Sequence, residues 1–184
     1  FFATVPAGRV YGTLRAAAGD AGASAYAAIQ RAFAAGYVSS ATLALAGVIR
    51  GTLLDEPEPG LALIDTALSR DPYLSVEHAF AAMVLVRIGD LEAAQLRFAA
   101  YKRLVPLHPM YHLIDGVAVL IDLLQGRSEQ AAARGRELTE LCPFLLFPAI
   151  PYLAALGMLG LLDEAERVAA RIEALSPGLD IETI

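Results

Sequence analysis

The residues with the clearest potential for chemistry lie near the middle of the chain, at His108, His112 and Asp115. On one continuous helix, this spacing of four and then three residues would place the side chains on one face, where they could bind zinc. His108, however, lies between Leu107 and Pro109, before the expected helix start, so helical spacing does not apply to it. We therefore interpret these residues as ordinary turn and helix-start residues, and we expect neither a metal nor a cofactor.

The sequence lacks the motifs of common catalytic sites. It has no Gly-x-x-x-x-Gly-Lys-Ser/Thr phosphate loop, no Gly-x-Ser-x-Gly nucleophile elbow and no His-Glu-x-x-His zinc motif. Cys142 is the only cysteine, and it precedes Pro143 at an expected helix C-terminus, where the helix dipole disfavours a thiolate. We interpret Cys142 as a small buried residue and expect that the protein is not an enzyme.

Two carboxylates lie on an otherwise apolar segment. Asp115 and Asp122 are seven residues apart, so they share one face of the helix expected there. One interpretation is a solvated stripe, or ion pairs with Arg50 or Arg87 on neighbouring helices. The other is a contact point for a cationic group of a ligand. The sequence leaves both interpretations open.

The composition is that of a folded protein that buries many apolar side chains. Of the 184 residues, 57% are hydrophobic and 18% are charged, which excludes a disordered chain. The formal net charge of -6 argues against binding nucleic acid through its phosphates. The uncharged segment from Phe144 to Leu162 contains two prolines and two glycines and lacks flanking aromatic or basic anchors. We therefore expect a buried helix there, no membrane contact and a cytoplasmic protein.

Helix-breaking residues recur along the chain at a nearly constant interval. Successive breakers are 36, 34, 37 and 34 residues apart, and a proline follows each of the last four after seventeen residues. The breakers are Gly19, Asp55, Gly89, Gly126 and Gly160, and the prolines are Pro72, Pro106, Pro143 and Pro177. Glycine permits a left-handed turn between two helices, whereas proline ends the second helix. The period therefore predicts repeated helical hairpins.

The sequence thus predicts an all-α protein of about five helix pairs. First helices are expected near 6–18, 40–53, 75–88, 110–125 and 145–159, and second helices near 21–35, 58–70, 91–104, 128–141 and 162–175. The repeats lie near 5–36, 39–72, 74–106, 109–143 and 144–177, in a single repeat domain over 1–178 with a tail over 179–184. Ser75, Asp90 and Ser128 are expected to cap helix N-termini.

These hairpins resemble the tetratricopeptide repeat superfamily. The resemblance is carried by Gly89-Asp-Leu-Glu-Ala-Ala with Phe98 and Pro106, by Gly126-Arg-Ser-Glu-Gln-Ala with Leu-Cys-Pro143, and by Leu159-Gly-Leu-Leu-Asp-Glu-Ala165 with Leu175-Ser-Pro-Gly178. The last repeat is similar to the C-terminal repeats of bacterial multidomain regulators. The aromatic pair that is typical of each first helix in the family is largely missing. The resemblance implies a right-handed superhelix whose first helices line the concave side.

On this resemblance, the concave side forms an apolar groove that binds a partner. The groove positions carried over from the family are Leu45, Ile49, Leu53, Val76, Met83, Val86, Leu113, Leu120, Leu124, Phe147, Ile150 and Met158, with Asp115 and Asp122 as polar contacts. The basic clamp by which the family holds acidic peptide tails is absent. We therefore expect a partner protein or peptide with an apolar segment.

We expect this groove to be covered, because a large exposed apolar surface is unfavourable in a free monomer. Candidate occupants are the chain's own 1–10 segment or its tail, a second copy in a homodimer, a neighbouring domain, and an amphipathic partner helix. The expected function is a protein–protein interaction scaffold. The alternative is the C-terminal regulatory or oligomerisation region of a larger bacterial nucleotidyl cyclase or transcription regulator.

Overall fold

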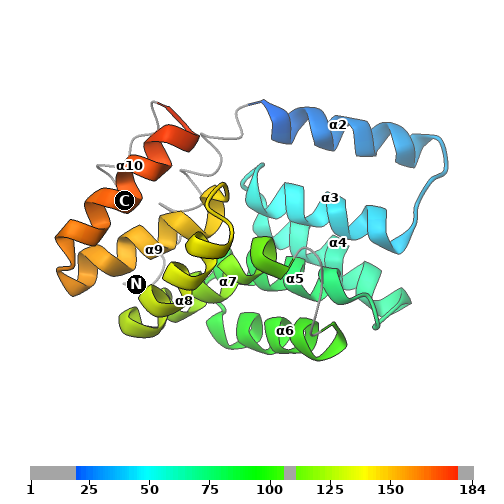
Figure 1. Cartoon of the computed structure of the whole chain (residues 1–184). Coiled ribbons are helices and arrows are strands. Elements are labelled where there is room, and N and C mark those ends of the chain that lie inside the picture. Colours follow the sequence, from blue (N-terminus) through cyan, green and yellow to red (C-terminus); the bar gives the residue numbers. More distant parts are fainter. Residues whose placement is uncertain (1–19, 106–110, 178–184) are drawn as a thin grey trace. The chain divides into compact units, whose positions relative to one another are not determined.

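The computed structural model describes residues 20–105 and 111–177 of the chain. These residues form nine α-helices and no strand (Figure 1). The helices are α2 (Ala21–Ala34), α3 (Ser40–Thr52), α4 (Pro57–Arg70), α5 (Ser75–Ile88), α6 (Leu91–Leu104), α7 (Tyr111–Leu124), α8 (Ser128–Leu141), α9 (Leu146–Leu159) and α10 (Leu162–Leu175). The predicted all-α class is therefore confirmed for the described residues, where each helix boundary lies within one residue of its prediction. The helix expected near 6–18 and the tail lie outside them.

The backbone at the described turns inside helix pairs confirms four of the predicted breaker positions, and Gly19 lies outside the described residues. Gly89, Gly126 and Gly160 have φ values of 93°, 76° and 70°, in the left-handed region that glycine adopts without steric cost. Asp55 has a φ of 63° and is the only non-glycine residue in this region among those described. Asp55 therefore takes the place of the glycine in its own helix pair, as the constant interval along the sequence indicates.

The predicted N-caps are confirmed at one position and wrong at two. The Ala93 amide donates a hydrogen bond of 3.0 Å to the Asp90 carboxylate, which satisfies one free N–H at the start of α6. Ser75 and Ser128, in contrast, are the first residues inside α5 and α8. Each of these helices begins one residue earlier than the cap prediction implies. The N-cap residues are therefore Leu74 and Arg127, and neither side chain forms a capping hydrogen bond.

The chain divides into two compact units, and the division falls between residues 106 and 107, within the longest interval between breakers. We call residues 20–105 the N-terminal unit and residues 111–177 the C-terminal unit, and we describe each by itself. The sequence had led us to expect one continuous array. Within each unit, a helical hairpin is covered by the next helix: α5 packs on α3 and α4, and α9 packs on α7 and α8.

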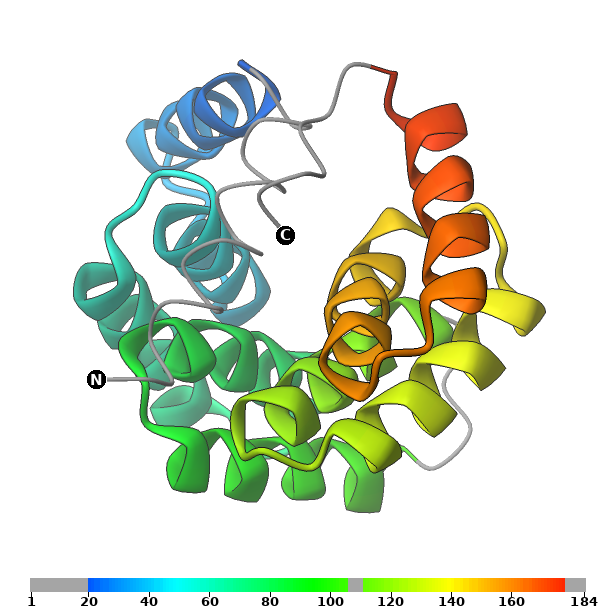
Figure 2. The same ribbon diagram turned by 90° about the vertical axis from the view of Figure 1, so that its left-hand side faces the viewer.

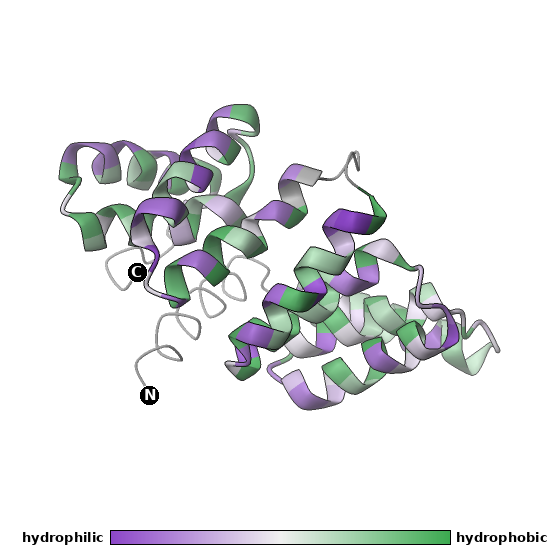
Figure 3. Ribbon diagram, turned by 90° about the horizontal axis from the view of Figure 1, so that it is seen from below, coloured by the Kyte–Doolittle hydropathy of each residue, from purple (hydrophilic) through white to green (hydrophobic). Residues whose placement is uncertain are grey.

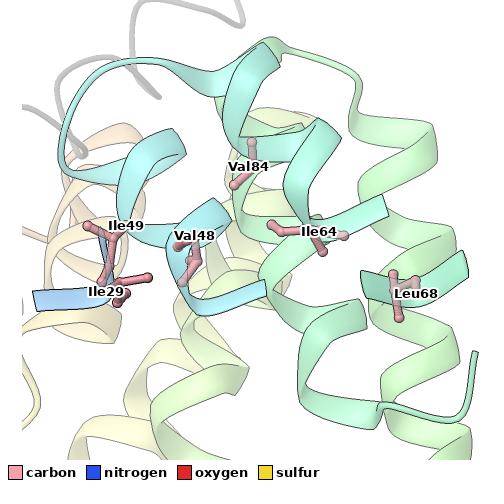
Figure 4. Close-up of a cluster of buried hydrophobic side chains, with 8 residues drawn as sticks. Ile29, Val48, Ile49, Ile64, Leu68 and Val84 are labelled. Atoms are coloured by element: carbon pink, nitrogen blue, oxygen red, sulfur yellow. The ribbon is translucent and has the colours of Figure 1, made fainter. Parts of the chain in front are cut away.

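The core of the N-terminal unit lies between α2, α3, α4 and α5 (Figure 4). Its buried members, each at most 8% exposed, are Ile29, Ala46, Val48, Ile49, Ile64, Leu68, Ala81 and Val84. Glycines bring α3 close to its neighbours. A methyl group on Gly47 would lie 2.5 Å from the carbonyl oxygen of Gly60, and one on Gly51 would lie 2.7 Å from Cγ2 of Val84. The close contact of α3 with α4 and α5 therefore depends on glycine, which has no side chain, at these two positions.

The core of the C-terminal unit is formed chiefly by α7 and α9, which are almost entirely apolar. Fully or nearly fully buried residues include Val117, Val119, Leu120, Ala131, Ile150, Tyr152, Leu156 and Ile172. Two glycines again lie in close contact with large side chains of a neighbouring helix. A methyl group on Gly116 would lie 2.6 Å from the Phe147 ring, and one on Gly135 would lie 2.6 Å from Cβ of Tyr152. By contrast, α8 and α10 bear both hydrophilic and hydrophobic residues, so they bury one face only (Figure 3).

Candidate partner-binding surface

The last helical hairpin, α9–α10, ends the described part of the C-terminal unit (Figure 2). Gly160 ends α9 in the left-handed conformation, and the Leu161 amide donates to the carbonyl oxygen of Leu156 at 3.0 Å. This is the hydrogen-bond pattern with which helices commonly end at a glycine. The chain reverses within two residues, so α10 packs back against α9.

A cleft of about 560 Å³ runs along this hairpin. It is lined by Leu153, Ala154, Gly157, Met158, Leu162, Ala165, Glu166 and Ala169. The Met158 and Leu162 side chains are each 65% exposed. No atom from outside the local backbone lies within 4 Å of the place where a Cβ on Gly157 would be, so this glycine leaves a depression. The cleft is thus an open apolar surface with a hollow between larger side chains.

A polar cluster fixes α10 against α8 and α9 in the same unit. The Arg136 guanidinium donates two hydrogen bonds to the Glu164 carboxylate, at 2.7 and 2.8 Å, and the Tyr152 hydroxyl donates to the same carboxylate. Arg136 and then Tyr152 stabilise the ionised form and lower the pKa of Glu164 to about 2. Burial, followed by the bond to Glu164, raises the pKa of Tyr152 to about 12. These contacts hold the hairpin in place by charge-assisted hydrogen bonds.

The predicted groove residues do not share one exposed surface. Five of them are buried, with exposures between 0% and 8%: Ile49, Val86, Leu120, Phe147 and Ile150. Leu53, Val76, Met83 and Leu124 are half-buried, and the side chain of Leu113 lies outside the described residues. Only Leu45 and Met158 are well exposed, at 43% and 65%.

The burial of these five side chains has a direct physical cause. Successive first helices pack on each other within each unit, α5 on α3 and α9 on α7, so much of the apolar surface assigned to a groove faces another helix. Phe147, for example, packs against Gly116 of α7. In this structure these side chains belong to the core and offer no surface to a partner. For the remaining residues, groove lining stays a prediction.

Both predicted polar contact residues are buried as well. Asp115 is 4% exposed and Asp122 is 6% exposed. Arg127 donates to one Asp122 carboxylate oxygen at 3.1 and 2.6 Å, and Arg134 donates to the other at 3.1 Å. The interpretation as an ion pair is therefore confirmed for Asp122, although its partners lie in the following turn and in α8.

The ion-pair partners proposed from the sequence were wrong for Asp122. Arg50 binds Glu56 and Arg87 binds Asp55, so each pairs with a carboxylate in or next to the α3–α4 turn. Seven-residue spacing identifies the shared helix face but does not identify the neighbour of that face. Asp122 instead pairs with two arginines that follow it closely in the sequence, Arg127 in the turn after α7 and Arg134 in α8.

The other candidate chemical groups form no cluster in the described part of the chain. No group of three or more histidine, cysteine, aspartate or glutamate side chains is placed there to hold a metal ion. His108 of the sequence-based metal candidate lies outside the described residues, and Cys142 is half-buried at the end of α8. Within 20–105 and 111–177, no helix has both the length and the apolar character needed to cross a bilayer.

Sequence reasoning found one residue of the cleft, Met158, and missed the others. The signal for them was present in α10, where Leu162, Ala165 and Ala169 recur at helical spacing. The family resemblance places the groove on first helices, so it points to no residue of α10, which is a second helix. Comparison of the chain with family models, curated proteins and solved structures finds no match. A functional assignment must therefore come from the chemistry of the surfaces themselves.

Proposed function

We propose that this chain is a non-enzymatic helical-repeat protein of the tetratricopeptide type that binds a partner protein through apolar surface. The regular helix pairs, the left-handed residue at each turn and the packing of α9 on α7 and α8 support the repeat assignment. The right-handed superhelix that the sequence resemblance implies is part of this proposal.

The observation that carries the proposal is the α9–α10 cleft. Met158 and Leu162 expose most of their surface, although neighbouring apolar residues of the same helices are buried. Large exposed apolar side chains grouped around a depression are typical of protein interaction sites. Burying this surface against a partner would be favourable by the same hydrophobic effect that stabilises the core.

The lining of the cleft favours a protein partner over a small substrate. Small-molecule sites combine an apolar wall with several convergent polar groups that orient the ligand. Here Glu166 is the one charged residue among the lining residues, and the others are Leu, Ala, Gly and Met. A surface of this kind provides area for contact but no acid–base pair or nucleophile for a reaction.

Site-directed photo-crosslinking in cells that naturally contain the protein tests this function. A photoreactive phenylalanine replaces Met158 in one variant and Leu96 in the control, because Leu96 on α6 is similarly exposed, at 72%. We expect a discrete protein adduct from position 158 and none from position 96. Equal, diffuse labelling at both positions would contradict a binding site on α9–α10.

A further inference from the structure

The α9–α10 hairpin repeats, in register, a surface that is already occupied elsewhere in the same unit. The turns that follow α7 and α9 share one hydrogen-bond pattern 34 residues apart, because the Arg127 amide donates to the carbonyl oxygen of Asp122 as the Leu161 amide does to that of Leu156. Helix α10 likewise begins 34 residues after α8. This offset matches Ala154 and Gly157 of the cleft to Leu120 and Leu123 of α7. It matches Ala165 and Ala169 to Ala131 and Gly135 of α8.

All four matched residues of the α7–α8 hairpin are buried. Leu120, Leu123 and Ala131 are at most 4% exposed, and Gly135 lies under the Tyr152 side chain of α9. Leu124, which matches Met158, is half-buried. Helix α9 packs on both α7 and α8. The α3–α4 hairpin is covered by α5 in the same way. Among the described residues, no further helix follows α10, and the equivalent face of α9–α10 is the open cleft.

From this continuity, and resting on the proposed function, we infer that the cleft binds one amphipathic α-helix of a partner protein, in the position that α9 occupies on α7–α8. The contacting face of that helix is apolar, as are Phe147 and the ring of Tyr152, the side chains that α9 packs against the preceding pair. Helix-in-groove binding of this kind is common in protein recognition.

Differences between the two hairpins specify the partner further. Gly135 leaves room for the Tyr152 side chain to pack on α8. The matched residue on α10 is Ala169, whose methyl group leaves less room for a large side chain of a bound helix. The open depression on α9–α10 lies instead at Gly157, next to Met158. The large side chain of the bound helix therefore sits over Gly157, and a small one faces Ala169.

Charge selects a partner helix over a second copy of this chain. Within the described residues, the Glu166 carboxylate has no ion-pair partner, and it lies in the lining of the cleft. A two-fold contact through this cleft would bring two Glu166 carboxylates into one interface, between chains that each carry a net charge of -6. A helix with a lysine or arginine beside its apolar face avoids this repulsion and pairs with Glu166.

A panel of four synthetic amphipathic helical peptides of sixteen residues tests the inference on the intact protein. The peptides carry phenylalanine or alanine at the centre of the apolar face, and lysine or glutamate one turn away. Affinities are measured by fluorescence anisotropy for the wild type, Gly157→Leu and Glu166→Lys, with Glu137→Lys on α8 as the charge control. Circular dichroism checks that each variant is folded.

We expect the phenylalanine–lysine peptide to bind most tightly, and replacement of its phenylalanine to weaken binding by about tenfold or more. Gly157→Leu fills the depression, so it should remove the preference for phenylalanine over alanine. Glu166→Lys should reverse the preference for lysine over glutamate, with a change of about threefold or more, and Glu137→Lys should leave it unchanged.

Two results would overturn the inference. The first is a preference for phenylalanine that survives Gly157→Leu in a folded variant. The second is a concentration-dependent dimer in sedimentation equilibrium that Met158→Glu abolishes and Leu96→Glu preserves, because a second copy would then occupy the cleft. Failure of the proposed function itself is distinguished by the absence of protein adducts at position 158.

Discussion

Replacement of Gly47 by alanine separates helix propensity from helix packing. In an isolated helix, this change would stabilise the structure by about 1 kcal/mol, because glycine loses more backbone entropy than alanine. In α3, however, the new methyl carbon would lie 2.5 Å from the carbonyl oxygen of Gly60 and 2.6 Å from Cγ1 of Ile64. Carbon atoms in favourable contact lie about 3.5–4.0 Å apart, so α3 and α4 must separate by roughly 1 Å.

The cost of this separation sets the expected result. The Gly60 oxygen belongs to the backbone and cannot rotate away, and α5 closes the other side of α3 through Val84 at Gly51. Overpacking of this kind costs about 1–3 kcal/mol, and the rigid contact favours the upper end. After subtraction of the propensity gain, Gly47→Ala should lower the free energy of unfolding by about 2 kcal/mol. The corresponding fall in Tm is roughly 4–8 °C for a chain of this length.

Thermal unfolding followed by circular dichroism at 222 nm measures this effect, and Gly157→Ala is the matched control. Gly157 is also a glycine inside a helix, but a methyl group added there would meet nothing within 4 Å. Gly157→Ala should therefore keep the propensity gain and raise the free energy of unfolding by about 0.5–1 kcal/mol. If Gly47→Ala raises Tm as Gly157→Ala does, the close α3–α4 contact is refuted.

Three further predictions concern the C-terminal unit. Gly160→Ala should cost about 1–2 kcal/mol in urea unfolding, because its φ of 70° disfavours any Cβ although space is free around it. Asp122→Asn should cost about 2 kcal/mol by the same measurement, because it weakens charge-assisted bonds to a buried carboxylate. Asp65→Asn should cost less than about 1 kcal/mol, because the Asp65 side chain, at 46% exposed, is more open to solvent than that of Asp122 at 9%. Because the pKa of Glu164 is lowered to about 2 on folding, its stabilisation is full above the ordinary carboxyl pKa of 4.5 and is lost as the pH falls toward 2. Glu164→Gln should therefore flatten the dependence of Tm on pH in that window, and an unchanged slope would contradict the Arg136–Glu164 contact.

The sequence by itself determined the local structure of the described chain. Helix boundaries follow from residues that act through their own backbone preferences: glycine or aspartate at the turns, and proline beyond the second helices. Their spacing therefore predicts the boundaries without knowledge of which helices pack together. This is why Asp55 could be placed at a turn from the interval alone, whereas its left-handed conformation is known only from the structure. The apolar segment that contains α9 was also correctly interpreted as a helix, although the expected burial holds for only part of it, because Met158 is 65% exposed.

Only the tertiary structure decided which face of each helix remains accessible. Periodicity identifies apolar faces, but α7 and α9 are apolar on nearly all sides, so the sequence could not separate core residues from surface residues such as Met158. It likewise could not identify Arg127 and Arg134 as the partners of Asp122, because side-chain contacts depend on how helices are packed. Exposure is a property of neighbours in space, and the open α9–α10 cleft exists because no described helix covers that hairpin as α9 covers the preceding one.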